Sequence, residues 1–152
     1  MISKMKQAPL LNYLDVPPEE LSRLSKHQGW AMNVVGYLVY HALIMFGFTP
    51  LSYKGVCEYF AIGKGWGGVS LGFFFICDLD SIDYIKSHEV GHCIQNAMVG
   101  GFTMALFSIA SAARCLWRKI NKPQTSYYSW FFEGDASQMG VAYVQKWGNK
   151  TE

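Results

Sequence analysis

The sequence has few charged residues and lacks the common cysteine patterns. Asp, Glu, Lys and Arg make up 16% of its 152 residues, against about 25% in a typical domain. The net charge is only +2, and the basic residues form no stripe, which argues against a nucleic-acid partner. No CxxC pair is present, so we expect the four cysteines to be reduced, buried thiols. Because residues 1–29 are polar, we expect no cleavable signal peptide among them.

Apolar and aromatic side chains are abundant instead. Hydrophobic residues make up 51% of the chain and aromatic residues 16%, which excludes a disordered chain. Such a composition is typical of a globule with a large core or of a protein that contacts lipid. We expect an N-terminal arm and short helix over residues 1–29, followed by a single domain over residues 30–152.

The spacing of apolar residues and chain breakers predicts a mainly α (α+β) fold, a helical bundle with one small β-hairpin. Helices are expected at about 19–27, 30–48, 81–99, 102–117 and 126–147. Asp80 or Ser81 is expected to cap the helix that starts near residue 81. The runs 56–62 and 68–76 are short, aromatic and β-branched, and a Gly-rich turn between them predicts the hairpin.

The motif His88-Glu89-Val90-Gly91-His92 lies within one of these helices. Residues at i and i+4 share a helix face, so both imidazoles can reach one metal ion. Zinc suits such ligands and leaves a position open for water. Glu89 is placed to act as general base toward a zinc-activated water. Gly91 allows another backbone to pack close to this helix.

A third ligand must come from elsewhere in the chain. Glu133 is the best candidate, because it is an isolated carboxylate among aromatic residues on a separate downstream helix. Gln95, on the same face as His88, is expected either to bond a ligand histidine, water or substrate or to be satisfied by backbone. The full set of candidates for the third ligand is His27, His41, Asp78, Asp80, Asp83, Glu133 and Asp135.

An HExxH motif at 88–92, followed by a helical Glu at position 133, resembles the gluzincin class of zinc metallopeptidases. Over residues 66–141 the chain is more closely similar to a family of small, mostly uncharacterised bacterial and phage proteins that look membrane-associated and carry HExGHxxQ. The resemblance implies His88, His92 and Glu133 as Zn²⁺ ligands and Glu89 as base, and it implies no particular substrate. Its residues are Ser70-Leu71-Gly72, the run from His88 to His92, Gln95, Tyr127-Tyr128 and Glu133-Gly134-Asp135-Ala136.

The chain departs from the gluzincin pattern in the residues around the ligands. Gluzincins commonly place an Asp one helical turn after the ligand Glu to orient the first histidine. Here that position is Ser137, which offers no charge, while Asp135 lies elsewhere around the helix. Tyr127 and Tyr128 are expected either to place a phenol at the developing oxyanion or to be buried aromatics.

The run 30–48 contains no formally charged side chain unless His41 is protonated, and a helix of this length just suffices to span a bilayer. The alternatives are a membrane span and a fully buried core helix. Residues 102–117 are expected to form a buried, re-entrant or interface-lying helix, because a span there would separate Glu133 from the histidines. We therefore expect membrane lipid as a partner, and the resemblance to bacterial and phage proteins implies a bacterial cytoplasmic membrane.

The leading interpretation is a membrane-associated zinc metallopeptidase that hydrolyses a peptide or protein substrate. Such enzymes bind substrate as an extended strand along a sheet edge, and Gly68–Ile76 is a candidate for that edge. The alternative is a catalytically silent, metal-stabilised membrane protein with a structural or interaction role. A third possibility is a plain helical membrane protein in which the motif is accidental.

Overall fold

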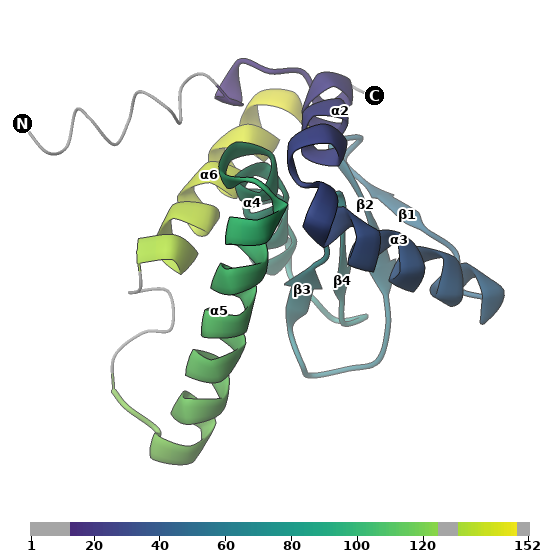
Figure 1. Ribbon diagram of the computed structural model, residues 1–152. Helices are drawn as coiled ribbons and strands as arrows, with labels where there is room; N and C mark the ends of the chain where they lie inside the picture. Colours follow the sequence, from purple (N-terminus) through teal and green to yellow (C-terminus); the bar gives the residue numbers. More distant parts are fainter. Residues whose placement is uncertain (1–12, 125–130, 149–152) are drawn as a thin grey trace, which may run out of the picture.

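A computed structural model describes residues 13–124 and 131–148. It has the predicted α+β, mainly α, class (Figure 1). The elements in chain order are α2 (Pro18–Gln28), α3 (Trp30–Met45), β1 (Leu51–Tyr53), β2 (Cys57–Ala61), β3 (Gly68–Ser70), β4 (Phe74–Cys77), α4 (Asp83–Val99), α5 (Gly101–Asn121) and α6 (Phe131–Trp147).

The strands form one mixed sheet in the order β1-β2-β4-β3. Strands β1 and β2 pair antiparallel, as do β3 and β4, while β2 and β4 pair in parallel. The prediction that 56–62 and 68–76 form a single hairpin is therefore wrong. Gly72, with φ +87°, turns the second run back on itself, and the turn is closed by the Leu71 N–H, which donates to the Phe74 carbonyl.

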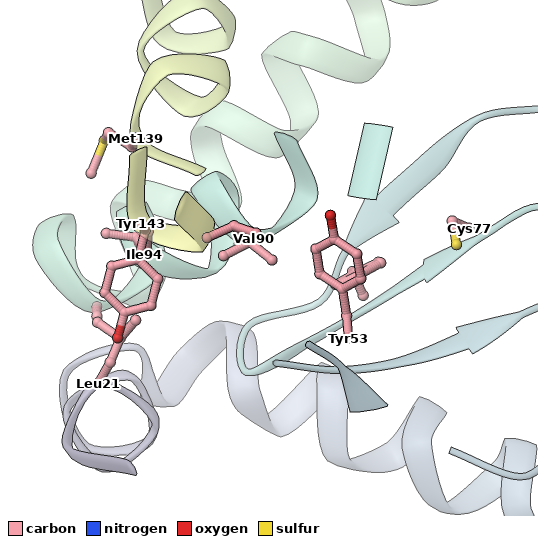
Figure 2. Close-up of a cluster of buried hydrophobic side chains, with 10 residues drawn as sticks. Leu21, Tyr53, Cys77, Val90, Ile94, Met139 and Tyr143 are labelled. Atoms are coloured by element: carbon pink, nitrogen blue, oxygen red, sulfur yellow. The ribbon is translucent and has the colours of Figure 1, made fainter. Parts of the chain in front are cut away.

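Helix α4 lies at the centre of the molecule, packed against α6, α2 and the sheet (Figure 1). Eleven consecutive residues, from Ser87 to Ala97, are buried, so this helix has no solvent-facing side along most of its length. Around it the main core is formed by side chains of α2, β1, β4, α4 and α6 (Figure 2). Its buried members are Leu21, Tyr53, Phe75, Cys77, Val90, Ile94, Ala97, Met139, Tyr143 and Val144.

The ends of α4 are set by the chain on either side of it. The helix begins at Asp83 without a side-chain cap, so the predicted capping by Asp80 or Ser81 is wrong. Ser81 Oγ instead donates to Asp78 Oδ1 at 2.6 Å in the preceding loop. Gly100 ends the helix with φ +81°, which a residue with a side chain rarely adopts.

Helices α3 and α5 bury few of their residues. Helix α3 covers only the 16 residues Trp30–Met45 of the expected 30–48, because the chain turns at Gly47 (φ +88°). It buries only three residues, so the prediction of a fully buried core helix is wrong, and α5 buries only two. Among the described residues, we find no helix with the length and apolar character needed to cross a bilayer.

Candidate metal centre

The two histidines of the HExxH motif converge on one point, as their spacing predicts. His88 and His92 lie one turn apart on α4, both buried. Their Nε2 atoms are 3.1 Å apart. This arrangement follows from the helix itself, since side chains at i and i+4 share a face.

Glu133 completes the group from α6. Its side chain is fully buried, and its Oε2 lies 3.1 Å from His88 Nε2 and 3.2 Å from His92 Nε2. Ser111 Oγ, from α5, donates a short hydrogen bond to Glu133 Oε1. The three side chains can hold one metal ion. We call His88, His92 and Glu133 the triad.

The outer nitrogen of His88 is held by Ser137 of α6, at 2.8 Å from Nδ1 to Oγ. Ser137 donates its only proton to the Glu133 carbonyl, at 3.1 Å. Its Oγ must then accept from His88, which puts the ring proton on Nδ1. In the neutral ring the lone pair of Nε2 is therefore directed into the triad.

Gln95 fixes the position of the ring proton of His92 in the same way. Its Nε2 donates to the Phe132 carbonyl at 2.9 Å, which fixes the orientation of the amide. Its Oε1 lies 2.8 Å from His92 Nδ1 and accepts the proton there. His92, like His88, therefore turns an unprotonated Nε2 inward when neutral.

Two imidazole lone pairs and a carboxylate thus face one another at 3.1–3.2 Å. Such a cluster needs a positive charge, either a proton on one ring or a metal ion. Burial favours a raised pKa for the Glu133 carboxyl, but its close contacts with His88 and His92 outweigh this effect and hold that pKa below its usual range. Burial lowers the pKa of His92, yet its bond to Glu133 reverses the shift and raises it.

The separations also suit a metal ion. Tetrahedral zinc, with bonds of about 2.0–2.1 Å to nitrogen and oxygen, keeps its ligand atoms roughly 3.3 Å apart. The three pairs of atoms in the triad are within a few tenths of an ångström of that spacing. The donor set, two imidazoles and one carboxylate, is compatible with several divalent ions.

Glu89 lies beside the triad and faces strand β3. Ser70 Oγ is 2.8 Å from its Oε2 and 2.7 Å from its carbonyl oxygen, and donates its proton to this residue. Burial raises the pKa of the Glu89 carboxyl, against the lowering effect of His92 and His88. A Cβ at Gly68 would lie 2.8 Å from Glu89 Oε1, so a side chain at this position would displace the Glu89 carboxylate.

The crossing of α4 and α6 is closer than side chains would allow. A Cβ at Gly91 would lie 1.9 Å from the Ala136 carbonyl oxygen, and one at Gly140 would lie 1.7 Å from the Ser87 carbonyl oxygen. The expectation that Gly91 admits another backbone is therefore confirmed, and its partner is α6. This contact brings Glu133 within reach of the histidines.

A cavity of about 330 Å³ opens onto the triad and Glu89. Residues 66–70, which include β3, line one side of it, and α5 lines another through Ser108, Ser111 and Cys115. Strand β3 is an edge of the sheet. A larger cavity of about 370 Å³, between α2 and the sheet, includes Cys57 and Cys93 and contains no member of the triad.

The remaining predicted site residues are Asp135, Tyr127 and Tyr128. Asp135 is partly exposed on α6, and the prediction that it supports the metal ligands, together with Gln95 and Ser137, stays a prediction. Tyr127 and Tyr128 lie outside the described residues. Sequence reasoning named Ser70 only as part of the resemblance and missed the hydrogen bond of its hydroxyl to Glu89, and it missed the contact of Ser111 with Glu133. For Ser111 the signal was a hydroxyl in an otherwise apolar run.

Compared with known protein families, curated proteins and solved structures, the chain matches none of them. The functional assignment therefore depends on the geometry of the triad and its surroundings.

Proposed function

We propose that this protein is a zinc-dependent peptidase that hydrolyses peptide bonds with Glu89 as general base. The observation that carries the proposal is the buried triad, in which Ser137 and Gln95 hold both histidines with their Nε2 lone pairs inward. Zinc would supply a Lewis acid that activates water and polarises the scissile carbonyl.

Glu89 is suited to move a proton between water and leaving group. Its carboxyl lines the same cavity as the triad and is held by Ser70 on the β3 side. Its raised pKa brings it closer to neutrality, where a group can both accept a proton and return it. Glu89 would take a proton from the attacking water and pass it to the departing amine.

The edge of β3 offers a place for the substrate backbone. Gly68, Val69 and Ser70 border the cavity beside the triad, and Val69 is exposed. An extended peptide that adds to this edge would bring one of its carbonyl groups near the triad. The small cavity favours peptides or flexible segments over folded proteins.

A second candidate function is a metal-stabilised protein without turnover. The observation that favours it is the Ser137 contact, because a neutral hydroxyl raises the basicity of His88 less than a carboxylate would. In that case the ion would serve only to join α4 to α6.

The test combines metal analysis with a peptide assay. Purified protein, stripped of metal and reloaded with zinc, is incubated with a library of fluorogenic decapeptides, alongside Glu89→Gln. We expect about one zinc per chain in both proteins and hydrolysis only in the wild type. Glu19→Gln, the same substitution at an exposed carboxylate on α2, serves as a matched control and should hydrolyse peptides as the wild type does. Zinc binding without hydrolysis dependent on Glu89 supports the silent alternative, and failure to bind any divalent metal refutes both.

A further inference from the structure

Two neighbouring helices expose apolar side chains instead of burying them. Helix α3 and the turn that follows it, together with α5, carry most of the large hydrophobic side chains that are exposed in the described part of the chain. Large apolar side chains that gather on the surface of a protein mark an interaction site.

On α5 the exposed apolar residues recur at intervals of three, four and seven. Phe102, Leu106, Ile109, Leu116 and Ile120 follow this spacing, and Phe102, Ile109 and Ile120 are 73%, 67% and 71% exposed. Residues so spaced lie on one face of a helix. At 1.5 Å per residue, the 21 residues of α5 extend this stripe over about 30 Å.

Helix α3 repeats the pattern without any charged side chain. Trp30, Val34, Leu38 and Met45 are exposed at similar intervals, and Leu38 and Met45 are 70% and 86% exposed. The buried side of the helix is small, since it consists of Met32 and two other residues.

The two helices start next to each other. A Cβ at Gly101, the first residue of α5, would lie 2.6 Å from the Gly29 carbonyl oxygen just before α3. From this contact the helices diverge on the same side of the molecule (Figure 1). Their exposed stripes together form the surface that we call the α3–α5 surface, comprising Trp30, Val34, Leu38, Met45, Phe102, Leu106, Ile109, Leu116, Trp117 and Ile120.

The charge of α5 distinguishes between possible binding partners of the α3–α5 surface. The sequence contains no Asp or Glu between Glu89 and Glu133, whereas the second half of α5 and the residue after it carry Arg114, Arg118, Lys119 and Lys122. An amphipathic helix with basic residues beside an apolar stripe is typical of helices that lie in an anionic lipid interface. Symmetric pairing of two α5 helices would instead bring like charges together.

We propose that the α3–α5 surface docks onto an anionic lipid bilayer, with both helices lying in the interface and their apolar stripes among the acyl chains. Trp30 and Trp117 are the aromatic side chains that favour the headgroup level. The opposite side of α5 lines the metal cavity, so a docked molecule would hold that cavity about one helix diameter from the lipid. This inference does not depend on zinc binding or peptide hydrolysis.

The experiment measures co-sedimentation of the full chain with vesicles. We compare phosphatidylcholine alone with a mixture in which about a third of the lipid is phosphatidylglycerol, at low and high salt. We expect binding to the anionic vesicles, at least tenfold weaker binding to neutral ones, and loss of binding as salt rises.

Surface variants identify the part of the protein that binds. The double variant Ile109→Gln, Ile120→Gln is expected to lower partitioning at least tenfold, with an unchanged thermal midpoint because both side chains are exposed. Ile82→Gln, at an equally exposed apolar residue just before α4, is the matched control and is expected to bind as the wild type does. Lys119→Gln is expected to weaken binding to anionic vesicles only, and Arg23→Gln on α2 to leave it unchanged.

Three results would overturn the proposal. The first is a wild-type protein that stays in the supernatant with anionic vesicles at low salt. The second is a double variant that binds these vesicles as tightly as the wild type. The third is a concentration-dependent dimer in sedimentation velocity that the double variant abolishes, which would make a second copy of the chain the occupant.

Discussion

Helix α4 carries two buried polar clusters, and they differ in charge. One turn beyond His92, Asn96 donates from Nδ2 to Ser25 Oγ at 2.8 Å and to Asn33 Oδ1 at 3.3 Å. Asn33 Nδ2 in turn donates to the Ser25 carbonyl at 2.7 Å. We call Ser25, Asn33 and Asn96 the amide cluster; it connects α2, α3 and α4.

Nearly all hydrogen-bonding side-chain atoms of the amide cluster find partners within the protein. Among its side-chain atoms, only Asn96 Oδ1 lacks a hydrogen-bond partner within the described residues. The triad holds an anion and two rings whose outer protons are already committed to Ser137 and Gln95. Burial of polar side chains is therefore no sign of a site by itself. A bound ligand is indicated where several hydrogen-bond acceptors face one another and the donors of the protein are already used elsewhere.

The largest effect is expected from Glu133→Gln, which removes the anion from the triad. Zinc affinity should fall more than ~100-fold, beyond the loss expected for an outer hydrogen bond. The stabilisation by zinc, about 2.7 kcal/mol at 100 times the dissociation constant, should disappear from thermal melts. Glu19→Gln, the same substitution at an exposed carboxylate on α2, is the control and should retain zinc affinity. Wild-type affinity in Glu133→Gln, measured by calorimetry, would contradict the assignment.

The next largest effect should come from Gly140→Ala, which tests how the triad is assembled. The added methyl group would lie 1.7 Å from the Ser87 carbonyl oxygen, so α4 and α6 must separate. We expect a loss of about 3 kcal/mol in the free energy of unfolding in urea, at the upper end of overpacking costs, and weaker zinc binding. Gln138→Ala, exposed on α6, controls for the substitution and should change neither quantity. Unaltered stability in Gly140→Ala would mean that the crossing is not tight.

Asn33→Ala breaks the amide cluster and spares the triad. The Ser25 carbonyl and the Asn96 amide lose a partner, so we expect a loss of about 2 kcal/mol in unfolding free energy. Zinc affinity should stay unchanged, in contrast to Glu133→Gln. The neighbouring exposed change Val34→Ala provides the stability control. If Asn33→Ala weakened zinc binding as strongly as it lowered stability, the two clusters would form one unit.

The smallest effect is expected from Ser137→Ala, which removes the partner of His88 Nδ1. Zinc affinity should fall about tenfold, the lower end for an outer-shell contact, equivalent to about 1.4 kcal/mol. Titration calorimetry of the variant beside Gln138→Ala measures this difference. No change would indicate that His88 is oriented by packing alone.

The sequence was informative about local features of the fold. The Pro-rich start of α2, the HExxH helix and its end at Gly100 follow from short-range rules, and the class followed from element lengths. Strand pairing was not predictable in this way. Runs 56–62 and 68–76 have the composition of a hairpin, but the turn at Gly72 lets the second run pair with itself and leaves β2 to join β4 in parallel.

The sequence by itself determined that two imidazoles point the same way, because the i, i+4 spacing on a helix decides that without any help from the rest of the chain. It singled out Glu133 among the candidate ligands by the apolar character of its surroundings, by its place on a separate helix and by the resemblance to gluzincins. The tertiary structure decided that this carboxylate reaches the histidines, because the approach of α6 depends on Gly91 and Gly140, which lie far apart in the sequence and whose meeting no local pattern reveals. It also decided that α3 and α5 keep their apolar faces outside, since exposure is a property of how helices pack and not of their composition.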